Sequence, residues 1–269
     1  MSNDTTAPTE TNNQFNSSAT QSLTRSSGAS IAYHALAASS TNTQPGIVFM
    51  TGFMSDMTGD KALALENLAR ERGQAFLRFD YQGHGDSSGK FADGTIGLWA
   101  EDALAVFDAL TEGPQILVGS SMGGWMMLLT ALARPERVAG LVGIAAAPDF
   151  TEDLLAKELT KDQMAEMEEK GFVIVPSGYE DDYTFTKALF DDGRTHLVLR
   201  DEIPLECPVR LIHGLEDQSV PWQTTLTIQE KLRSEDVEIN LIKCGDHRLS
   251  EAEDLERLTR IVAALVDGL

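Results

Sequence analysis

The chain has 269 residues, of which 42% are hydrophobic and 23% charged, and its formal net charge is −21. This is enough apolar material for one large core, and α/β proteins of this length often form a single domain. A surface this acidic repels nucleic-acid phosphates and anionic lipid headgroups. We therefore expect neither a nucleic-acid partner nor a stable membrane anchor.

The N-terminal region and the cysteines indicate the compartment. Residues 1–22 are polar and contain no apolar signal region, so we expect a disordered tail. No apolar run is long enough to cross a bilayer. The two cysteines, Cys207 and Cys244, are too few for a disulfide framework or a zinc site. We expect a cytoplasmic protein without a metal or organic cofactor.

A single domain is predicted over residues 23–269. It begins with a short antiparallel strand at 30–37, paired with 22–26. From residue 47 onward, apolar strands alternate with helical segments, which indicates a mostly parallel sheet flanked by helices. Strands are predicted at 47–51, 75–80, 115–119, 138–145, 209–213 and 237–243, and helices at 61–72, 95–110, 122–134 and from 249 to the end.

The alternation is interrupted between the strand that ends near Ala146 and the strand that starts near Val209. Residues 149–203 form an insertion, with an acidic helical stretch at 150–170, a short strand at 172–175 and a helix at 183–190. An insertion after the carboxyl end of a sheet strand is well placed to cover a ligand crevice. We predict a lid; the alternative is a packing appendage.

The candidate nucleophile lies in the sequence Gly-Ser-Ser-Met-Gly at residues 119–123, between a predicted buried strand and a predicted helix. In a G-x-S-x-G turn the central serine adopts a strained backbone, and small neighbours are needed to avoid clashes. The helix that follows favours negative charge at its N-terminus. Ser121 is therefore predicted as the nucleophile, and Ser120, at the first variable position, is not.

A serine hydroxyl needs a base to remove its proton. His247 follows the last predicted strand, where this type of fold presents its base. The other histidines are expected to be structural or hydrogen-bonding, and one of them to brace the loop that follows it; they are His34, His84, His196 and, as the bracing residue, His213.

The acid that orients the base is expected after the preceding strand, in the order Ser, Asp, His. Asp217 is the best candidate, because its carboxylate could accept a hydrogen bond from the far nitrogen of the imidazole. Glu216, one residue away, is a rival, and Asp246 is a weaker one.

Stabilising an oxyanion requires two backbone N–H groups. One is expected from Met122, the residue after the nucleophile. The other is expected from the loop after the first parallel strand, where Phe53 follows Gly52. An apolar acyl pocket is predicted from the Met and Phe residues of the lid together with Met54, Met57 and Met126, although such residues also serve as ordinary core.

Five stretches carry a family resemblance: GFMSDMTGDKALALE, RFDYQGHGDSSG, GPQILVGSSMGGWMMLLTALARPERV, CPVRLIHGLEDQSVPW and DHR. They resemble the mitochondrial palmitoyl-protein thioesterases of the α/β-hydrolase-domain family, from about Ile47 to the C-terminus. The resemblance implies an α/β-hydrolase fold and a triad of Ser121, Asp217 and His247. It also implies hydrolysis of acyl thioesters, including S-acylated proteins, with acyl-glucuronide-type esters as secondary substrates.

The residues also leave other functions open. The same triad serves general short-chain carboxylesterases, C–C bond hydrolases and aminopeptidases. A haloalkane dehalogenase is disfavoured because the nucleophile is a serine. From another class, the chain could be a non-catalytic ligand-binding protein on a hydrolase scaffold, which the complete triad argues against.

Overall fold

The computed structural model describes residues 19–175 and 182–269, so most of the predicted tail at 1–22 lies outside the described residues. Strand β1 (Gln21–Thr24) begins inside that predicted tail and pairs antiparallel with β2 (Ser30–Leu36). The short strand has one large apolar side chain, Leu23. Its signal in the sequence is therefore weak, and its place depends on the pairing with β2.

Within the described residues, the main sheet has eight strands in the order β1-β2-β4-β3-β5-β6-β9-β10. The strands from β4 to β10 in this order run parallel, and β2 is antiparallel to β4. The mostly parallel sheet predicted from the alternation is confirmed. Its parallel strands are β3 (Gly46–Met50), β4 (Phe76–Phe79), β5 (Gln115–Ser120), β6 (Val138–Ile144), β9 (Val209–Gly214) and β10 (Val237–Ile242).

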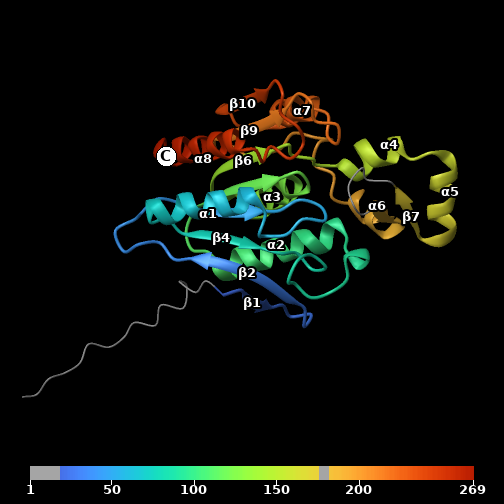
Figure 1. The fold of residues 1–269 in the computed structure, drawn as a ribbon, viewed down its shortest axis with the longest axis horizontal. Helices are drawn as coiled ribbons and strands as arrows, with labels where there is room; N and C mark the ends of the chain where they lie inside the picture. Colours follow the sequence, from blue (N-terminus) through green and yellow to red (C-terminus); the bar gives the residue numbers. More distant parts are fainter. Residues whose placement is uncertain (1–18, 176–181) are drawn as a thin grey trace, which may run out of the picture.

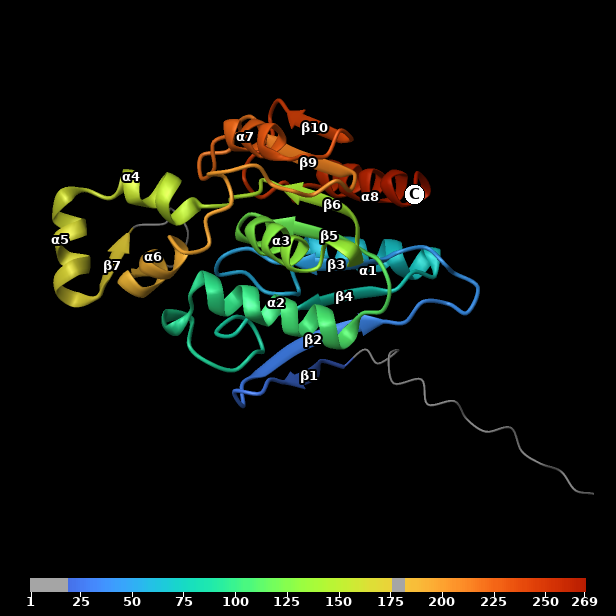
Figure 2. The ribbon, with the colours of Figure 1, turned by 180° about the vertical axis from the view of Figure 1, so that it is seen from behind.

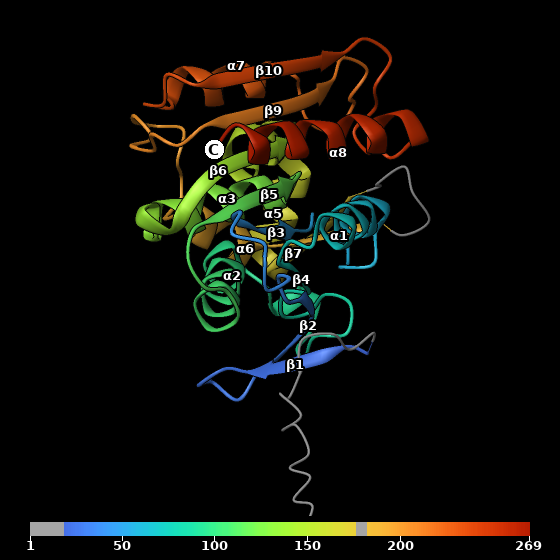
Figure 3. The same ribbon diagram turned by 90° about the vertical axis from the view of Figure 1, so that its left-hand side faces the viewer.

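Helices cover both faces of this sheet (Figures 1 and 3). One face carries α1 (Asp60–Arg72) and α8 (Ala252–Asp267), whose apolar residues form one core cluster with alternate residues of the strands. The other face carries α2 (Ile96–Leu110) and α3 (Met122–Ala133). Because both faces are covered, β3 and β5 are buried along their whole length, which explains their continuous apolar sequences.

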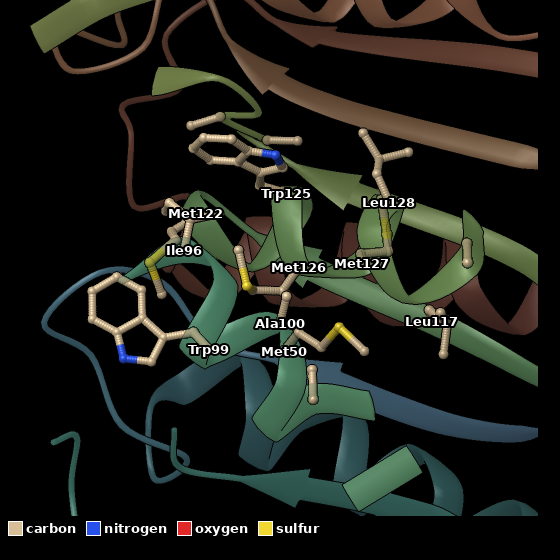
Figure 4. Close-up of a cluster of buried hydrophobic side chains, with 14 of the residues drawn as sticks. Met50, Ile96, Trp99, Ala100, Leu117, Met122, Trp125, Met126, Met127 and Leu128 are labelled. Atoms are coloured by element: carbon tan, nitrogen blue, oxygen red, sulfur yellow. The ribbon is translucent and has the colours of Figure 1, made fainter. Parts of the chain in front are cut away.

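The second core cluster is built around α2, α3 and β3. Figure 4 shows Trp99 of α2 and Trp125 and Met126 of α3 in this cluster, near Met50 of β3. A helix that the sequence analysis missed, α7 (Gln223–Lys231), joins the same cluster through Ile228. Few of its side chains are buried, so its apolar periodicity is weak.

The insertion between β6 and β9 stands at one end of the sheet (Figures 1 and 2). It begins with a π-helical turn at Thr151–Leu155 and contains α4 (Ala156–Glu158), α5 (Lys161–Lys170), the hairpin of β7 (Phe172–Val175) and β8 (Tyr183–Thr186), and α6 (Lys187–Gly193).

The predicted helix at 183–190 is wrong in its first half. Residues Tyr183–Thr186 are β-branched or aromatic and pair with β7 as strand β8. The helix α6 begins only at Lys187, after Thr186, whose hydroxyl oxygen accepts the backbone N–H of Leu189.

The two ends of the insertion are joined by Asp149, which is fully buried and has a positive φ of 58°. Its Oδ1 accepts the N–H of Val198 at 2.8 Å, and its Oδ2 accepts the N–H of Leu199 at 2.9 Å. One carboxylate therefore satisfies two backbone donors where the chain returns to the sheet.

We expect Asp149→Asn to lower the free energy of unfolding by about 1–3 kcal/mol, because one of the two backbone donors loses its acceptor. Asparagine tolerates the left-handed backbone, so backbone strain does not confuse the result. Urea denaturation measures the effect. As a control, Asp153→Asn removes only exposed ion pairs with Lys157 and Arg200, at a cost below about 1 kcal/mol. Equal losses of unfolding free energy in both variants would contradict a stabilising role for the two Asp149 hydrogen bonds.

Candidate active site

Ser121 lies on the tight turn between β5 and α3, with φ 55° and ψ −122°. Its backbone N–H donates to Ile144 O on the neighbouring strand at 2.9 Å. The two motif glycines are needed for close packing here. A Cβ on Gly119 would lie 2.3 Å from Gly123 O, and one on Gly123 would lie 2.0 Å from Met50 O. The turn thus presents Ser121 at the carboxyl end of the sheet and at the N-terminus of α3.

His247 lies in the loop after β10 and contacts both other predicted triad residues. The Ser121 hydroxyl donates to His247 Nε2 at 3.0 Å, and His247 Nδ1–H donates to Asp217 Oδ2 at 2.7 Å. The side chain of Asp217 is fully buried and that of His247 is 21% exposed. The structure therefore brings the three residues together in one hydrogen-bonded chain, open to solvent at the histidine.

The Asp217 carboxylate accepts hydrogen bonds at both oxygens. Its Oδ1 accepts the N–H groups of Ser219 and Val220, each at 2.8 Å, and its Oδ2 accepts from His247 and His213. Burial raises the pKa of Asp217. The hydrogen bonds from His213 and His247 and the charge of His247 lower this pKa by a larger amount. The net pKa is well below the usual range for a carboxyl group.

The two rival acids lie elsewhere. Glu216 is exposed, and Asp246, also exposed, accepts the backbone N–H of Leu249 with its Oδ1 at 2.9 Å. Of the three candidates, Asp217 is the one that contacts His247 in the described residues.

The two predicted oxyanion donors border the serine. Met122 is the first residue of α3, so its N–H has no carbonyl partner within the helix. The loop containing Phe53 runs directly against the nucleophile, because a Cβ on Gly52 would lie 3.3 Å from the Ser121 Cβ. Met54, which follows, has a positive φ of 53° and so turns the chain sharply at this point.

The ring of Phe53 joins this loop to the insertion. Its centroid lies 5.8 Å from that of Phe150, 5.9 Å from Tyr183 and 5.6 Å from Phe185, all in the insertion. On its other side it meets Phe91, at 4.8 Å. The loop next to Ser121 and the insertion therefore share one aromatic cluster.

A pocket of about 1250 Å³ opens at Ser121 and His247. The insertion supplies apolar residues to its wall, and these are Phe150, Leu154, Leu155, Val175, Tyr183 and Phe185. Phe150 and Phe185 were predicted for this wall, whereas the predicted lid methionines, Met164 and Met167, do not line it. The leucines of the π-helical turn, Val175 and Tyr183 were not predicted. The available signal was local: the pair Leu154–Leu155 and the apolar run at 172–175 stand out in an otherwise acidic stretch.

The structure revises the roles expected for Met57 and Met126 and shows where His84 lies. Met54 lines the pocket, but Met57 and Met126 are fully buried core residues outside its wall. His84 is also buried, packed edge-on against Phe91 and Trp99, and burial lowers its pKa to about 4. It is therefore an uncharged core side chain, and its Nδ1 makes the expected kind of hydrogen bond, to Gln82 O at 3.4 Å.

Membrane spans and metal clusters can be assessed over residues 19–175 and 182–269. None of the helices there combines the length and the apolar character needed to cross a membrane. No group of three or more His, Cys, Asp or Glu side chains in the same ranges is arranged to hold a metal ion.

Comparison with known proteins shows close relatives. A family described as "Serine aminopeptidase, S33" matches residues 44–172. The mitochondrial palmitoyl-protein thioesterase ABHD10 of Mus musculus is 43% identical over 233 residues, which cover 84% of this chain and 76% of that protein. The Homo sapiens protein of the same name is 42% identical over 229 residues, covering 84% and 74%.

Solved structures agree with the sequence matches. The structure of mouse α/β-hydrolase domain-containing protein 10 superposes with a TM-score of 0.85 at 40% identity, covering 93% of this chain and 99% of that one. A putative hydrolase from Agrobacterium vitis S4 superposes with a TM-score of 0.88, also at 40% identity, covering 92% and 98%. The predicted α/β-hydrolase fold and the family resemblance are confirmed.

The expected cytoplasmic location is wrong, because the relatives at 42% and 43% identity are mitochondrial proteins by name. The expectation rested on the lack of an apolar targeting or membrane segment. Such a segment distinguishes secreted and membrane proteins from the rest. Its absence does not separate one aqueous compartment from another.

The low pKa of Asp217 makes part of the stability depend on pH. A carboxyl group with a depressed folded pKa stabilises the fold above its unfolded value of about 3.9, and this contribution is lost as the pH falls through the folded value. Urea denaturation should show wild type more stable than Asp217→Asn at about pH 5, with the difference shrinking towards about pH 2. Glu216→Gln, at an exposed neighbour, is the control. A difference that grew towards low pH would contradict the depressed pKa.

Proposed function

This chain belongs to the α/β-hydrolase family of serine hydrolases that includes the ABHD10 palmitoyl-protein thioesterases, and we propose that it cleaves acyl thioesters. Its substrates include S-acyl cysteine in proteins, with acyl-glucuronide-type oxygen esters as secondary substrates. The observation that carries the proposal is the hydrogen-bonded chain Ser121–His247–Asp217 at the mouth of a pocket with one apolar wall.

The proposed mechanism is acyl transfer to water. Ser121 Oγ attacks the acyl carbon while His247 Nε2, 3.0 Å away, takes its proton. The ionised Asp217 stabilises the imidazolium that forms, and the imidazolium then protonates the leaving thiolate or alkoxide. A water molecule activated by His247 releases the acid from Ser121. In both halves the oxyanion is held by the backbone N–H groups of Phe53 and Met122.

The insertion supplies the acyl subsite in this proposal. We assign the chain from β1 onward to a single hydrolase domain, which starts two residues before the predicted 23–269, and residues 149–203 are its lid. The pocket of about 1250 Å³ exceeds the roughly 300–1,000 Å³ of ordinary ligand pockets, and apolar lid residues line one wall. An acyl chain laid against that wall gains about 0.8 kcal/mol for each buried methylene group. Long acyl chains are therefore preferred.

The decisive experiment compares wild type with Ser121→Ala on matched acyl esters and acyl thioesters, from acetyl to palmitoyl, with product release followed directly. We expect wild type to prefer long thioesters and Ser121→Ala to lose activity by roughly a millionfold, because no other hydroxyl is activated. If short oxygen esters are preferred, the enzyme is a general carboxylesterase. Activity that survives Ser121→Ala overturns the mechanism.

The acyl subsite is tested by Leu155→Gln, which places an amide on the apolar wall. We expect kcat/KM for the palmitoyl thioester to fall about tenfold relative to the acetyl thioester, because the long chain alone contacts this wall. The control is Leu63→Gln, at an exposed leucine of α1 that is outside the pocket lining. Equal effects on both substrates would place the acyl chain elsewhere.

A further inference from the structure

Asp217 has a second imidazole partner besides His247. His213 lies on β9 and its side chain is fully buried. Its Nε2 lies 3.1 Å from Asp217 Oδ2 and 3.0 Å from Val220 O, and its Nδ1 lies 2.6 Å from Thr225 Oγ1 on α7. A histidine of the sheet is thus wedged between the acid loop and the following helix.

The partners decide where the proton of His213 sits. Nε2 faces a carboxylate and a carbonyl, which only accept hydrogen bonds, so it carries the proton and donates to both. Thr225 is buried, and the one hydrogen bond of its hydroxyl within the described residues is to Nδ1. The hydroxyl therefore donates to Nδ1. Hydrogen bonds at both ring nitrogens therefore hold His213 in one orientation.

The two oxygens of Asp217 are held in different ways. Two backbone N–H groups of its own loop hold Oδ1. Oδ2, the oxygen that faces His247, has no backbone donor in the described residues. Its partner other than His247 is His213. Without His213, only the two N–H groups at Oδ1 resist rotation of the carboxylate about its Cβ–Cγ bond, and such a rotation moves the ring of His247 with Oδ2.

We propose that His213, fixed by Thr225, is a positioning residue for the acyl-transfer reaction. It sets the plane of the Asp217 carboxylate and, through it, the distance between His247 Nε2 and Ser121 Oγ. This inference rests on the proposed hydrolase function. Misplacement of a base by about 1 Å costs on the order of a hundredfold in rate, so the hydrogen bond from His213 affects kcat and not substrate binding.

A matched pair of amides tests the proposal. The amide of His213→Gln reaches the position of Nε2 and can donate to Asp217. The shorter amide of His213→Asn reaches only the position of Nδ1, beside Thr225. Using 4-nitrophenyl octanoate and octanoyl-coenzyme A as probes, we expect His213→Gln to keep kcat within about tenfold of wild type. His213→Asn should lose about a hundredfold, with KM unchanged in both.

The controls separate a positioning role from a merely structural one. Thermal unfolding of both variants is measured, because both place a polar amide in the same buried space and should destabilise the fold similarly. Equal kcat values for the two variants, or a loss confined to KM, overturn the proposal. His34→Gln, at a histidine of β2 that contacts Thr20, removes a histidine without touching the site and should leave kcat unchanged.

Thr225→Val keeps the test decisive if both amide variants unfold. It preserves the shape of a buried residue and removes the donor to Nδ1. We expect kcat to fall by about threefold to tenfold at unchanged KM, as for the loss of one buried hydrogen bond. An unchanged kcat overturns the proposal. Failure of the proposed hydrolase function gives a different result. In that case wild type and Ser121→Ala are equally inactive on both probes.

Discussion

The close backbone contact at the turn between β5 and α3 is the constraint on which the rest of the site depends. Gly119 and Gly123 let the chain reverse with no room for a side chain, and Ser121 takes the positive φ that the reversal requires. This strain persists because the surrounding strands are buried on both faces and hold the turn in place. The same contact places the serine at a helix N-terminus, where developing negative charge is favoured.

A parallel sheet gathers distant residues at one edge. Ser121 follows β5, Asp217 follows β9 and His247 follows β10, and all these strands end at the same side of the sheet. The insertion begins after β6, at that same side of the sheet. A separation of 126 residues between the serine and the histidine therefore does not loosen their geometry, since each loop starts from a strand fixed by its ladder to the next.

The parts of the fold that follow from apolar periodicity could be predicted from the sequence. Buried strands such as β3 and β5 are continuous apolar runs, and α1 ends at a glycine with positive φ, so their places are visible without the structure. Helix α7 could not be predicted, because few of its residues are buried. Strand β8 could not be told from a helix, since its identity comes from pairing with β7.

The candidate site shows the same division. Positions after strands identified Ser121, Asp217 and His247, and the structure joins them by hydrogen bonds; their catalytic roles stay proposals. The contacts between Phe53 and the insertion, and between His213 and Thr225, could not be predicted from the sequence. They depend on how side chains of different elements pack against one another, which the apolar periodicity of a single element does not record.

The shared aromatic cluster around Phe53 limits which substitutions this site can accept. The residue that borders the nucleophile packs on rings supplied by the insertion, so the two segments must change together. An insertion transplanted from another hydrolase without matching rings leaves a void beside the serine. A change of ring size at Phe53 therefore requires a compensating change in the insertion, so the loop and the insertion act as one packing unit.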